Sequence, residues 1–293
     1  MIVAAIPAYN EEKTIAKVVV RAMKYVDKVF VVDDGSTDDT ATIAEHLGAH
    51  LVRHKGNMGY GAAIQSCFSF ARDLNSDALV VLDADGQHNA DDIPQILAPI
   101  QAGQADIVVG SRFAGGDTSE VPSYRRAGLT LINEATNRVA KQKISDTQSG
   151  FRAYSRKAIQ GIRMYERGMG VTSEIQIRGS DAGLTVMEIP VEVAYKGLKT
   201  SSQNPFSHGL EILSAILRIA GEKHPILLLG VPGLFAIIAG LGGWLWVANR
   251  FAEFQQLPIG IALVSTVLLI GGIMAVMTGL ILYTVANVSR RLR

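Results

Sequence analysis

Two long uncharged runs near the C-terminus set the strongest constraint on how this chain can fold. Residues 225–248 carry no charged side chain, and residues 257–288 form a second such run. At about 1.5 Å of rise per residue, a helix of the first run is about 36 Å long, enough to cross a bilayer core. The second run is longer and would tilt or emerge into the interface. We predict two transmembrane helices, at about 225–248 and 258–288, rather than a buried soluble hairpin.

Basic residues around these runs predict how the hairpin is oriented. The loop expected between them, residues 249–256, has one arginine that is offset by a glutamate. Cytoplasmic flanks of membrane helices carry the excess of Lys and Arg. We therefore expect the preceding domain and both termini to face the cytoplasm at the cell membrane. The basic residues outside the runs are Arg218, Lys223, Arg290, Arg291 and Arg293.

Residues 201–223, just before the runs, predict an amphipathic helix. Apolar side chains recur at helical spacing from Phe206 to Ala220. Such a helix lies at the membrane surface or packs on the preceding domain, and periodicity alone does not separate these alternatives. In the second run, Gly271, Ala275 and Gly279 form a row of small residues, which predicts close helix packing. That packing would hold the hairpin together or join copies into a homo-oligomer.

Residues 1–200 read as an α/β domain, with short apolar strands that alternate with helices. This alternation predicts a Rossmann-like, mostly parallel sheet covered on both faces. A helix is expected to follow the first strand, with Asn10 as its N-cap. The strands expected from the apolar runs are 2–6, 29–32, 51–52, 78–82 and 107–109.

Polar clusters follow four of these strands. Because ligands of such sheets bind beyond the carboxyl ends of the strands, this placement predicts one large ligand across the crevice. Asp83 and Asp85 should point to one face of the sheet and need a cation, either a basic side chain or a metal shared with a phosphorylated ligand. A solvated acidic turn is the alternative. Residues 56–61 are rich in glycine but do not match a known phosphate-binding loop. Their glycines could let the backbone approach a ligand closely, and a flexible loop is the alternative.

Composition excludes some classes of protein. The formal net charge of +1 argues against nucleic acid as a partner, because such binding depends on an excess of positive charge. The single cysteine, Cys67, excludes an internal disulfide.

Five motifs occur in an order that indicates a known family. They read IPAYNEE at 6–12, VVDDGSTD at 31–38, DADGQH at 83–88, GSRF at 110–113 and DTQSGFR at 146–152. Over roughly the first two hundred residues the chain resembles the GT-A glycosyltransferases of family 2, specifically the dolichol-phosphate mannose synthase-like enzymes that use polyprenyl phosphates. The resemblance implies a GT-A catalytic domain at 1–200. Periodicity and the uncharged runs add the amphipathic interfacial helix at 201–223 and the membrane hairpin at 224–293, and the hairpin fits family members with an appended membrane anchor.

The resemblance also implies a nucleotide-sugar donor and a divalent cation. Mg²⁺ or Mn²⁺ would bind between Asp83, Asp85 and Gln87 and the donor diphosphate, because a hard cation prefers oxygen ligands and stabilises the leaving group. His88 is expected beside this metal rather than bound to it. The residues expected to contact the nucleotide sugar are Pro7, Tyr9, Glu11, Asp33, Asp34 and Asp83.

The implied acceptor is a polyprenyl phosphate, such as a dolichyl or undecaprenyl phosphate. It is already anionic, so it needs cations to bind it rather than a general base. Arg112 and either Arg125 or Arg126 are the leading candidates, and with Asp85 they complete the expected catalytic set. Further candidates for the lipid phosphate are Arg152, which also reads as a structural partner of Asp146, and Lys196 and Lys199.

The expected reaction is therefore transfer of one hexose with inversion, to give a polyprenyl-phosphate sugar for glycan assembly. The donor would be UDP-glucose, UDP-N-acetylglucosamine or GDP-mannose, and departures around residues 146–149 favour a UDP sugar. One alternative is a polysaccharide-synthase-like enzyme that acts on a glycan or lipid hydroxyl, but the chain lacks a Gln-x-x-Arg-Trp motif. A non-catalytic membrane scaffold is a third reading, which intact acidic residues disfavour.

Overall fold

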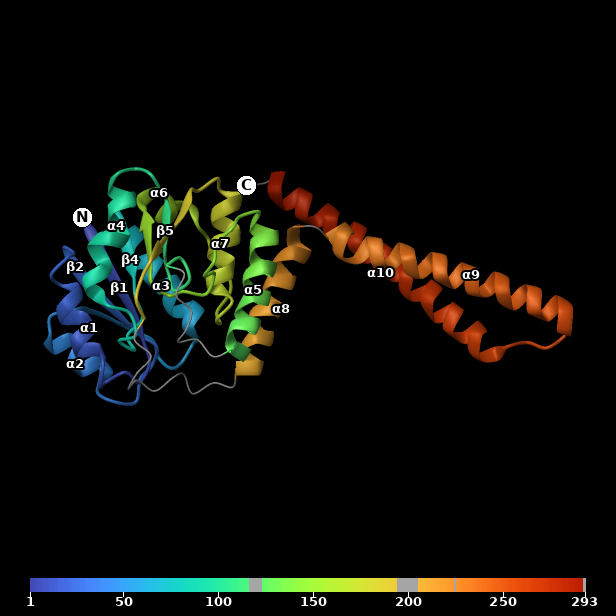
Figure 1. Cartoon of the computed structure of the whole chain (residues 1–293), viewed down its shortest axis with the longest axis horizontal. Coiled ribbons are helices and arrows are strands. Elements are labelled where there is room, and N and C mark those ends of the chain that lie inside the picture. Colours follow the sequence, from blue (N-terminus) through green and yellow to red (C-terminus); the bar gives the residue numbers. More distant parts are fainter. Residues whose placement is uncertain (116–122, 194–204, 224, 292–293) are drawn as a thin grey trace. The chain divides into compact units, whose positions relative to one another are not determined.

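The computed structural model describes residues 1–115, 123–193, 205–223 and 225–291. The side chains of residues 123–127, 205–208, 222 and 286–291 also lie outside the description. The chain divides into two compact units, Met1–Ile216 and Leu217–Arg293. The first is an α/β unit and the second contains the long paired helices (Figure 1).

A seven-stranded sheet forms the centre of the first unit. Within the described residues only β6 runs antiparallel to its neighbours, so the predicted mostly parallel sheet is confirmed. The sequence pattern did not predict β6 or β7. Both are short, and the Arg-Ala-Tyr-Ser of β6 has no apolar run. In spatial order the strands are β3 (His50–Arg53), β2 (Lys28–Asp33), β1 (Ile2–Ala8), β4 (Ala78–Val81), β6 (Arg152–Ser155), β5 (Ile107–Ser111) and β7 (Val186–Pro190).

Two apolar layers cover the sheet, because alternate strand side chains point to opposite faces. Ala4 and Ile6 of β1 belong to one layer, and Val3 and Ala5 to the other. The first layer is closed by α1 (Ile15–Ala22), α2 (Thr40–His46) and α4 (Ile93–Gln101), which a short 3₁₀ turn, η1 (Ala90–Asp92), precedes. The second is closed by α3 (Tyr60–Asp73), α6 (Arg156–Gly161) and α7 (Val171–Asp181).

The start of α1 differs from the prediction. Asn10 does not cap the helix, because its backbone is left-handed, with φ of 57°, and the helix begins five residues later. Its side-chain Oδ1 instead accepts a hydrogen bond from the backbone N–H of Thr37 at 2.9 Å. The Asn10 N–H donates to Ser36 Oγ at 2.9 Å. Asn10 therefore joins the loops that follow β1 and β2.

The strand order fixes where a ligand can bind. β1 lies between β2 and β4, so the chain crosses to one side of β1 first and to the other side later. At such a switch point the loops after the strands separate and leave a crevice at the carboxyl ends. Three of the predicted polar clusters follow β1, β2 and β4, at this edge.

Helix α8 (Pro205–Lys223) begins in the first unit, and one face of this part of the helix is packed within that unit. Ile212 and Ile216 share a buried cluster with Ile132 of α5 (Ser123–Ala140). Leu210, two residues before Ile212 and so on a different face of the helix, has 52% of its surface exposed. The face that carries Ile212 and Ile216 is therefore packed on the domain, as one of the two alternatives predicts. Leu210, on another face, is exposed.

The second unit consists of η2 (Ile226–Gly230, a π-helical turn), α9 (Val231–Phe254) and α10 (Ile259–Arg291). The segments Ile226–Phe254 and Ile259–Val285 are long and apolar enough to cross a membrane. Only 11% of the most apolar window of each is buried, unlike the helices of a soluble core. The turn between them is shorter than expected, because α9 continues to Phe254 and ends at Gln255, whose φ is 52°.

Small residues bring α9 and α10 together. A Cβ added to Gly233 would lie 2.8 Å from the Gly272 carbonyl oxygen, and one on Gly240 would lie 2.8 Å from the Ser265 carbonyl oxygen. Trp244 Nε1 also donates to Thr266 Oγ1 at 3.2 Å. Close packing within one hairpin is thus confirmed. Gly271, in the predicted row, has no described atom near its missing Cβ, and the homo-oligomer stays a prediction.

Candidate active site

A cavity of about 350 Å³ lies at the carboxyl ends of β1, β2 and β4. Its walls come from segments far apart in the sequence, as expected of a site at a switch point. Six residues singled out from sequence line it: Pro7, Tyr9, Glu11, Asp34, Asp83 and Asp85.

Three carboxyl groups in this lining share an environment that disfavours their negative charge. Burial raises the pKa of Asp83 to about 7, and the charge of Asp85 adds to the rise. The pKa of Asp85 is raised by its own burial. Burial also raises the pKa of Glu11, with a contribution from Asp85. Since the carboxyl groups repel one another, the cavity favours a cation.

Two neighbours fix the position of Asp83. Tyr60, at the start of α3, donates its hydroxyl hydrogen to Asp83 Oδ1 at 3.0 Å. Gly150 lies against the other side of the same carboxylate, where a Cβ would overlap its oxygens. The glycine of the DTQSGFR motif therefore leaves room for the aspartate of the DADGQH motif.

Asp34 holds the glycine-rich segment in place. Its Oδ1 accepts from the N–H of Met58 and its Oδ2 from the N–H of Gly59, both at 2.9 Å. Asp34 Oδ1 also lies 2.7 Å from His54 Nδ1. Gly35, with φ of +77°, leaves no space for a Cβ against Gly56. Residues 56–61 are therefore a fixed wall beside the ligand cavity rather than a flexible loop.

Of the residues predicted to bind the donor or the metal, Asp33 and Gln87 lie outside the lining of this cavity. Asp33 is fully buried and forms an ion pair with Arg53 Nε at 3.0 Å. Gln87 lines a neighbouring cavity, although its backbone N–H donates to Asp85 Oδ1 at 2.9 Å. His88 packs on the ring of Phe151, with centroids 5.3 Å apart. Burial, with the nearby charge of Arg112, lowers the pKa of His88 to about 4, so the ring is neutral at pH 7.

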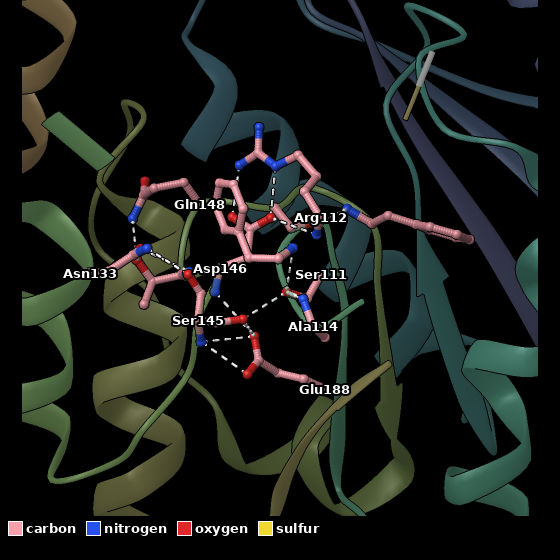
Figure 2. Close-up of polar contacts among 12 residues, drawn as sticks. Ser111, Arg112, Ala114, Asn133, Ser145, Asp146, Gln148 and Glu188 are labelled. Carbon is pink, nitrogen blue, oxygen red and sulfur yellow. Dashed lines mark hydrogen bonds and ion pairs between the residues drawn. The ribbon is translucent and has the colours of Figure 1, made fainter. Parts of the chain in front are cut away.

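Arg112, after β5, forms a bidentate ion pair with Asp146 (Figure 2). Its Nε and Nη2 donate to the two carboxylate oxygens at 2.7 Å each, and its backbone N–H donates to Oδ2 at 3.1 Å. Asp146 is fully buried. Burial alone would raise the pKa of Asp146, but these hydrogen bonds and the charge of Arg112 lower it. The pair joins the GSRF motif to the DTQSGFR motif.

Arg152 is buried, with 2% of its surface exposed, and its bonds go to the backbone. Its guanidinium donates to the carbonyl oxygens of Ser149, Thr147 and Thr172, at 2.8, 2.6 and 3.2 Å. It thus holds the loop before β6 rather than facing the cavity. Of the other predicted cations, Arg125 and Arg126 lie in the first turn of α5, and their side chains are outside the description. Lys196 and Lys199 lie outside the described residues.

Several lining residues are not predicted by the sequence pattern, among them Gln148, Tyr60 and Glu211. Gln148 lies in the cavity wall, where its Nε2 donates to Ser173 Oγ at 2.9 Å and its Oε1 accepts from Thr172 Oγ1 at 3.0 Å. Its place in the DTQSGFR motif was a usable signal. Glu211 of α8 and Tyr60 of α3 carry no local motif, and only the fold brings them to the cavity.

The donor set fits a metal shared with a ligand. Among the described residues no three His, Cys, Asp or Glu side chains form a complete metal cage. Asp83 and Asp85 provide carboxylate oxygens on one wall only. Mg²⁺ and Mn²⁺ commonly bind one or two carboxylates and take their other ligands from substrate phosphates and water. The acidic wall is therefore suited to such an ion together with a diphosphate.

Comparison with known proteins identifies the family. The sequence model described as "Glycosyl transferase family 2" matches residues 3–163. The chain belongs to this family. It is therefore a glycosyltransferase, as the five motifs predict.

Two relatives and one solved structure extend the comparison. Glycosyltransferase AglJ of Haloferax volcanii is 30% identical over 94% of this chain and 90% of its own length. The UDP-N-acetylglucosamine–dolichyl-phosphate N-acetylglucosaminyltransferase of Methanococcus voltae is 28% identical over 74% of this chain and 95% of its own. Glucosyl-3-phosphoglycerate synthase of Mycobacterium tuberculosis, solved with Mn²⁺, UDP-glucose and phosphoglyceric acid, has a TM-score of 0.59 at 21% identity, over 75% of this chain and 80% of that one. The structural likeness confirms the GT-A-like fold.

Proposed function

We propose that this glycosyltransferase transfers one hexose, with inversion, from a nucleotide-diphosphate sugar to a polyprenyl phosphate. The observation that carries the proposal is the cavity at the switch point, where Glu11, Asp83 and Asp85 converge without a basic side chain among the described lining residues. The Methanococcus relative is named for transfer to dolichyl phosphate, which supports the acceptor.

The donor half of the site contains the carboxylates of Asp83 and Asp85. Asp83 and Asp85 would hold Mg²⁺ or Mn²⁺, and Tyr60 and Gly150 keep Asp83 in position for it. When bound, the ion supplies Lewis-acid stabilisation of the departing nucleoside diphosphate. Tyr9 is 44% exposed and follows β1, Pro7 lies near the end of that strand, and both line the cavity, so both are placed to contact the base or ribose. The base and sugar of the donor are part of the proposal, and we favour a UDP sugar.

The acceptor half is suited to a nucleophile that is already ionised. A sugar or lipid hydroxyl needs a general base within hydrogen-bond reach, whereas a phosphate monoester does not. In the stretch 146–149 the side chain at the cavity is the amide of Gln148, which does not accept a proton at neutral pH. The carboxylate of this stretch, Asp146, is buried and paired with Arg112. We propose that Arg112, together with Arg125 or Arg126, attracts the lipid phosphate.

The membrane hairpin fits a lipid acceptor. Two segments long and apolar enough to cross a bilayer follow the catalytic unit, and the basic residues beside them favour a cytoplasmic catalytic unit. We propose that they anchor the enzyme in the membrane that carries the polyprenyl phosphate.

A donor panel tests the proposed reaction. Full-length protein in detergent, with Mg²⁺ or Mn²⁺ and a polyprenyl phosphate, is given radiolabelled UDP-glucose, UDP-N-acetylglucosamine or GDP-mannose. We expect one of these donors to label the lipid fraction, and EDTA to abolish the labelling. If none of them labels the lipid, the proposed function is wrong.

Glu211 is the one observation in favour of a hydroxyl acceptor. It lines the cavity and accepts a hydrogen bond from the Met169 N–H at 3.1 Å, so it could act as a general base. We expect Glu211→Gln to retain transfer to polyprenyl phosphate within about threefold, because its glutamine can still accept that bond and phosphate chemistry needs no base. A loss of about 10²-fold, of the size that general-base catalysis contributes, would instead favour a glycan or lipid hydroxyl as the acceptor.

Metal binding should weaken as the pH falls. Because the pKa of Asp83 is raised to about 7, this carboxyl is increasingly protonated below neutral pH and must lose its proton before a cation binds. Mn²⁺ affinity, measured by calorimetry between pH 8 and pH 6, is expected to fall by up to about tenfold per pH unit below that pKa. Constant affinity over this range would contradict the assignment of Asp83.

Without metal the same group should make stability depend on pH in a defined direction. The folded pKa of about 7 lies above the ordinary value of 3.8, so the folded protein binds this proton more tightly than the unfolded chain does. Its contribution to the free energy of unfolding is therefore present below 3.8 and is lost as the pH rises through about 7. Added Mn²⁺ should raise the unfolding temperature more at pH 8 than at pH 6.

A further inference from the structure

A second cavity, of about 360 Å³, lies beside the segment 54–62. The donor cavity is also lined by residues of this segment, including Asn57 and Tyr60. The second cavity has a different character, because its described lining residues include no carboxylate and three arginines. Its polar lining includes Arg72, Arg163, Arg167, His54, Ser66 and Ser69.

Arg72 is held in a fixed orientation at this cavity. Its Nε donates to the Ile159 carbonyl oxygen at 2.7 Å, and its Nη2 to the Ile162 carbonyl oxygen at 2.6 Å. The guanidinium also lies over the ring of Phe68, 5.7 Å from the centroid. A guanidinium fixed in this way loses little side-chain entropy when it binds an anion.

The positive charges in this cavity are only partly offset by nearby acids. Burial lowers the pKa of Arg72, the charge of Arg163 lowers it further, and the charge of Asp73 acts in the opposite direction. Arg163 and Arg167 are exposed, and within the described part of the chain neither forms an ion pair. An anion in the cavity would relieve this repulsion, which no described carboxylate in the lining does.

The cavity is joined to the donor site by hydrogen bonds. His54 Nε2 lies 2.9 Å from Ser66 Oγ, and its Nδ1 lies 2.7 Å from Asp34 Oδ1, in the wall of the donor cavity. On the other side, the carbonyl oxygen of Arg167 accepts from the Ala62 N–H at 3.2 Å. Any ligand held by Arg167 and His54 therefore touches the same segment that Asp34 fixes.

We propose that this arginine-lined cavity is a second ligand site, which binds a small, soluble, phosphate-bearing anion. Guanidinium groups bind phosphate oxygens through paired, charge-assisted hydrogen bonds, and the hydroxyls of Ser66 and Ser69 can add others. A volume of about 360 Å³ is within the range of small-ligand sites. The site is separate from the donor and acceptor positions proposed above and does not depend on them. Because His54 contacts Asp34, occupancy of this site would affect the segment 56–61, which lines the donor cavity.

Calorimetric titration of inorganic phosphate into the full-length protein in detergent tests this site. EDTA is present, and sodium chloride replaces phosphate at equal ionic strength in the blank, because exposed charges are screened by salt. We expect saturable binding that the double variant Arg163→Gln, Arg167→Gln weakens by at least about tenfold, since two charge-assisted bonds are lost. The single charge reversal Arg163→Glu, at an exposed position, is expected to do the same.

Arg138→Gln is the matched control, because Arg138 is an exposed arginine of α5 with 78% of its side chain accessible and is not among the lining residues of the cavity. This variant should bind phosphate as the parent does, and all variants should unfold at the parent temperature when phosphate is absent. Phosphate binding that is unchanged in both Arg163 variants would overturn the proposal, as would an equal loss in Arg138→Gln. Phosphate that binds only at the acceptor site would still bind to the Arg163 variants, so the two sites can be told apart.

Discussion

Replacing Asp85 with asparagine is expected to lower sugar transfer by about 10²- to 10³-fold, the size of effect seen when one electrostatic contact to a developing charge is removed. The asparagine keeps an oxygen that can accept the Gln87 N–H but loses the charge that would hold a cation against the donor diphosphate. The variant should fold normally. Its metal-free form should be at least as stable as the parent, because burial raises the pKa of Asp85 and its charge adds to the raised pKa of Asp83.

Initial rates of lipid labelling measure this effect, with Mn²⁺ varied over a wide range so that weaker binding and slower turnover are separated. Asp73→Asn is the matched control, since Asp73 is an exposed carboxylate at the end of α3 and is absent from the cavity lining. It should transfer sugar at the parent rate. Unchanged transfer by Asp85→Asn would remove the metal assignment.

Replacing Arg112 with methionine is expected to be among the most destabilising single changes in the catalytic unit. Asp146 is fully buried, and Arg112 supplies both of its side-chain hydrogen bonds. Methionine has similar length but leaves an uncompensated buried carboxylate, a defect that typically costs about 3–5 kcal/mol. Denaturant unfolding followed by circular dichroism would measure the loss as a lower midpoint for the catalytic unit.

A double variant separates this cause from loss of packing. Asp146→Asn removes the charge that Arg112 neutralises, so Arg112→Met with Asp146→Asn should be more stable than Arg112→Met alone. If the single variant unfolds within about 1 kcal/mol of the parent, the pair is not a structural ion pair of the kind described. Transfer activity in the double variant then reports on Arg112 itself, since the fold no longer depends on that charge.

Much of the donor half of the site follows from sequence. Apolar strands that end in acids, repeated along the chain, predict a parallel sheet with a ligand at one edge, and that edge carries Tyr9, Asp34 and Asp83. This inference succeeds because strand period and strand-end position are local properties. The long uncharged runs were recognised for the same reason, since length and composition decide them.

What could not be predicted depends on contacts between distant segments. The ion pair of Arg112 with the buried Asp146 joins residues 34 positions apart, so no local pattern shows it. Arg152 likewise looks like a phosphate ligand in its motif, yet its donors are taken up by three backbone carbonyls. Asn10 is a residue type that commonly caps helices, but its hydrogen bond to the loop after β2 holds its backbone in a left-handed conformation.

The alternatives left open by sequence were decided by packing. The glycine-rich segment 56–61 reads equally as a flexible loop or a ligand wall, and the hydrogen bonds from Asp34 make it a wall. The helix before the two long apolar helices could be interfacial or packed on the domain by its sequence pattern, and Ile212 and Ile216 pack one of its faces onto α5. In both cases the deciding partner lies in a different part of the sequence.

The chemical structure of the lipid product distinguishes inverting transfer to a phosphate from the alternative reactions. Full-length protein is incubated with the active α-linked donor and either polyprenyl phosphate or the free polyprenol, and the purified lipid product is examined by ¹H and ³¹P NMR. We expect a β-linked sugar on a single phosphorus and no product from the free alcohol. A product with two coupled phosphorus signals, an α-linked sugar, or equal transfer to the free polyprenol would contradict the proposed reaction.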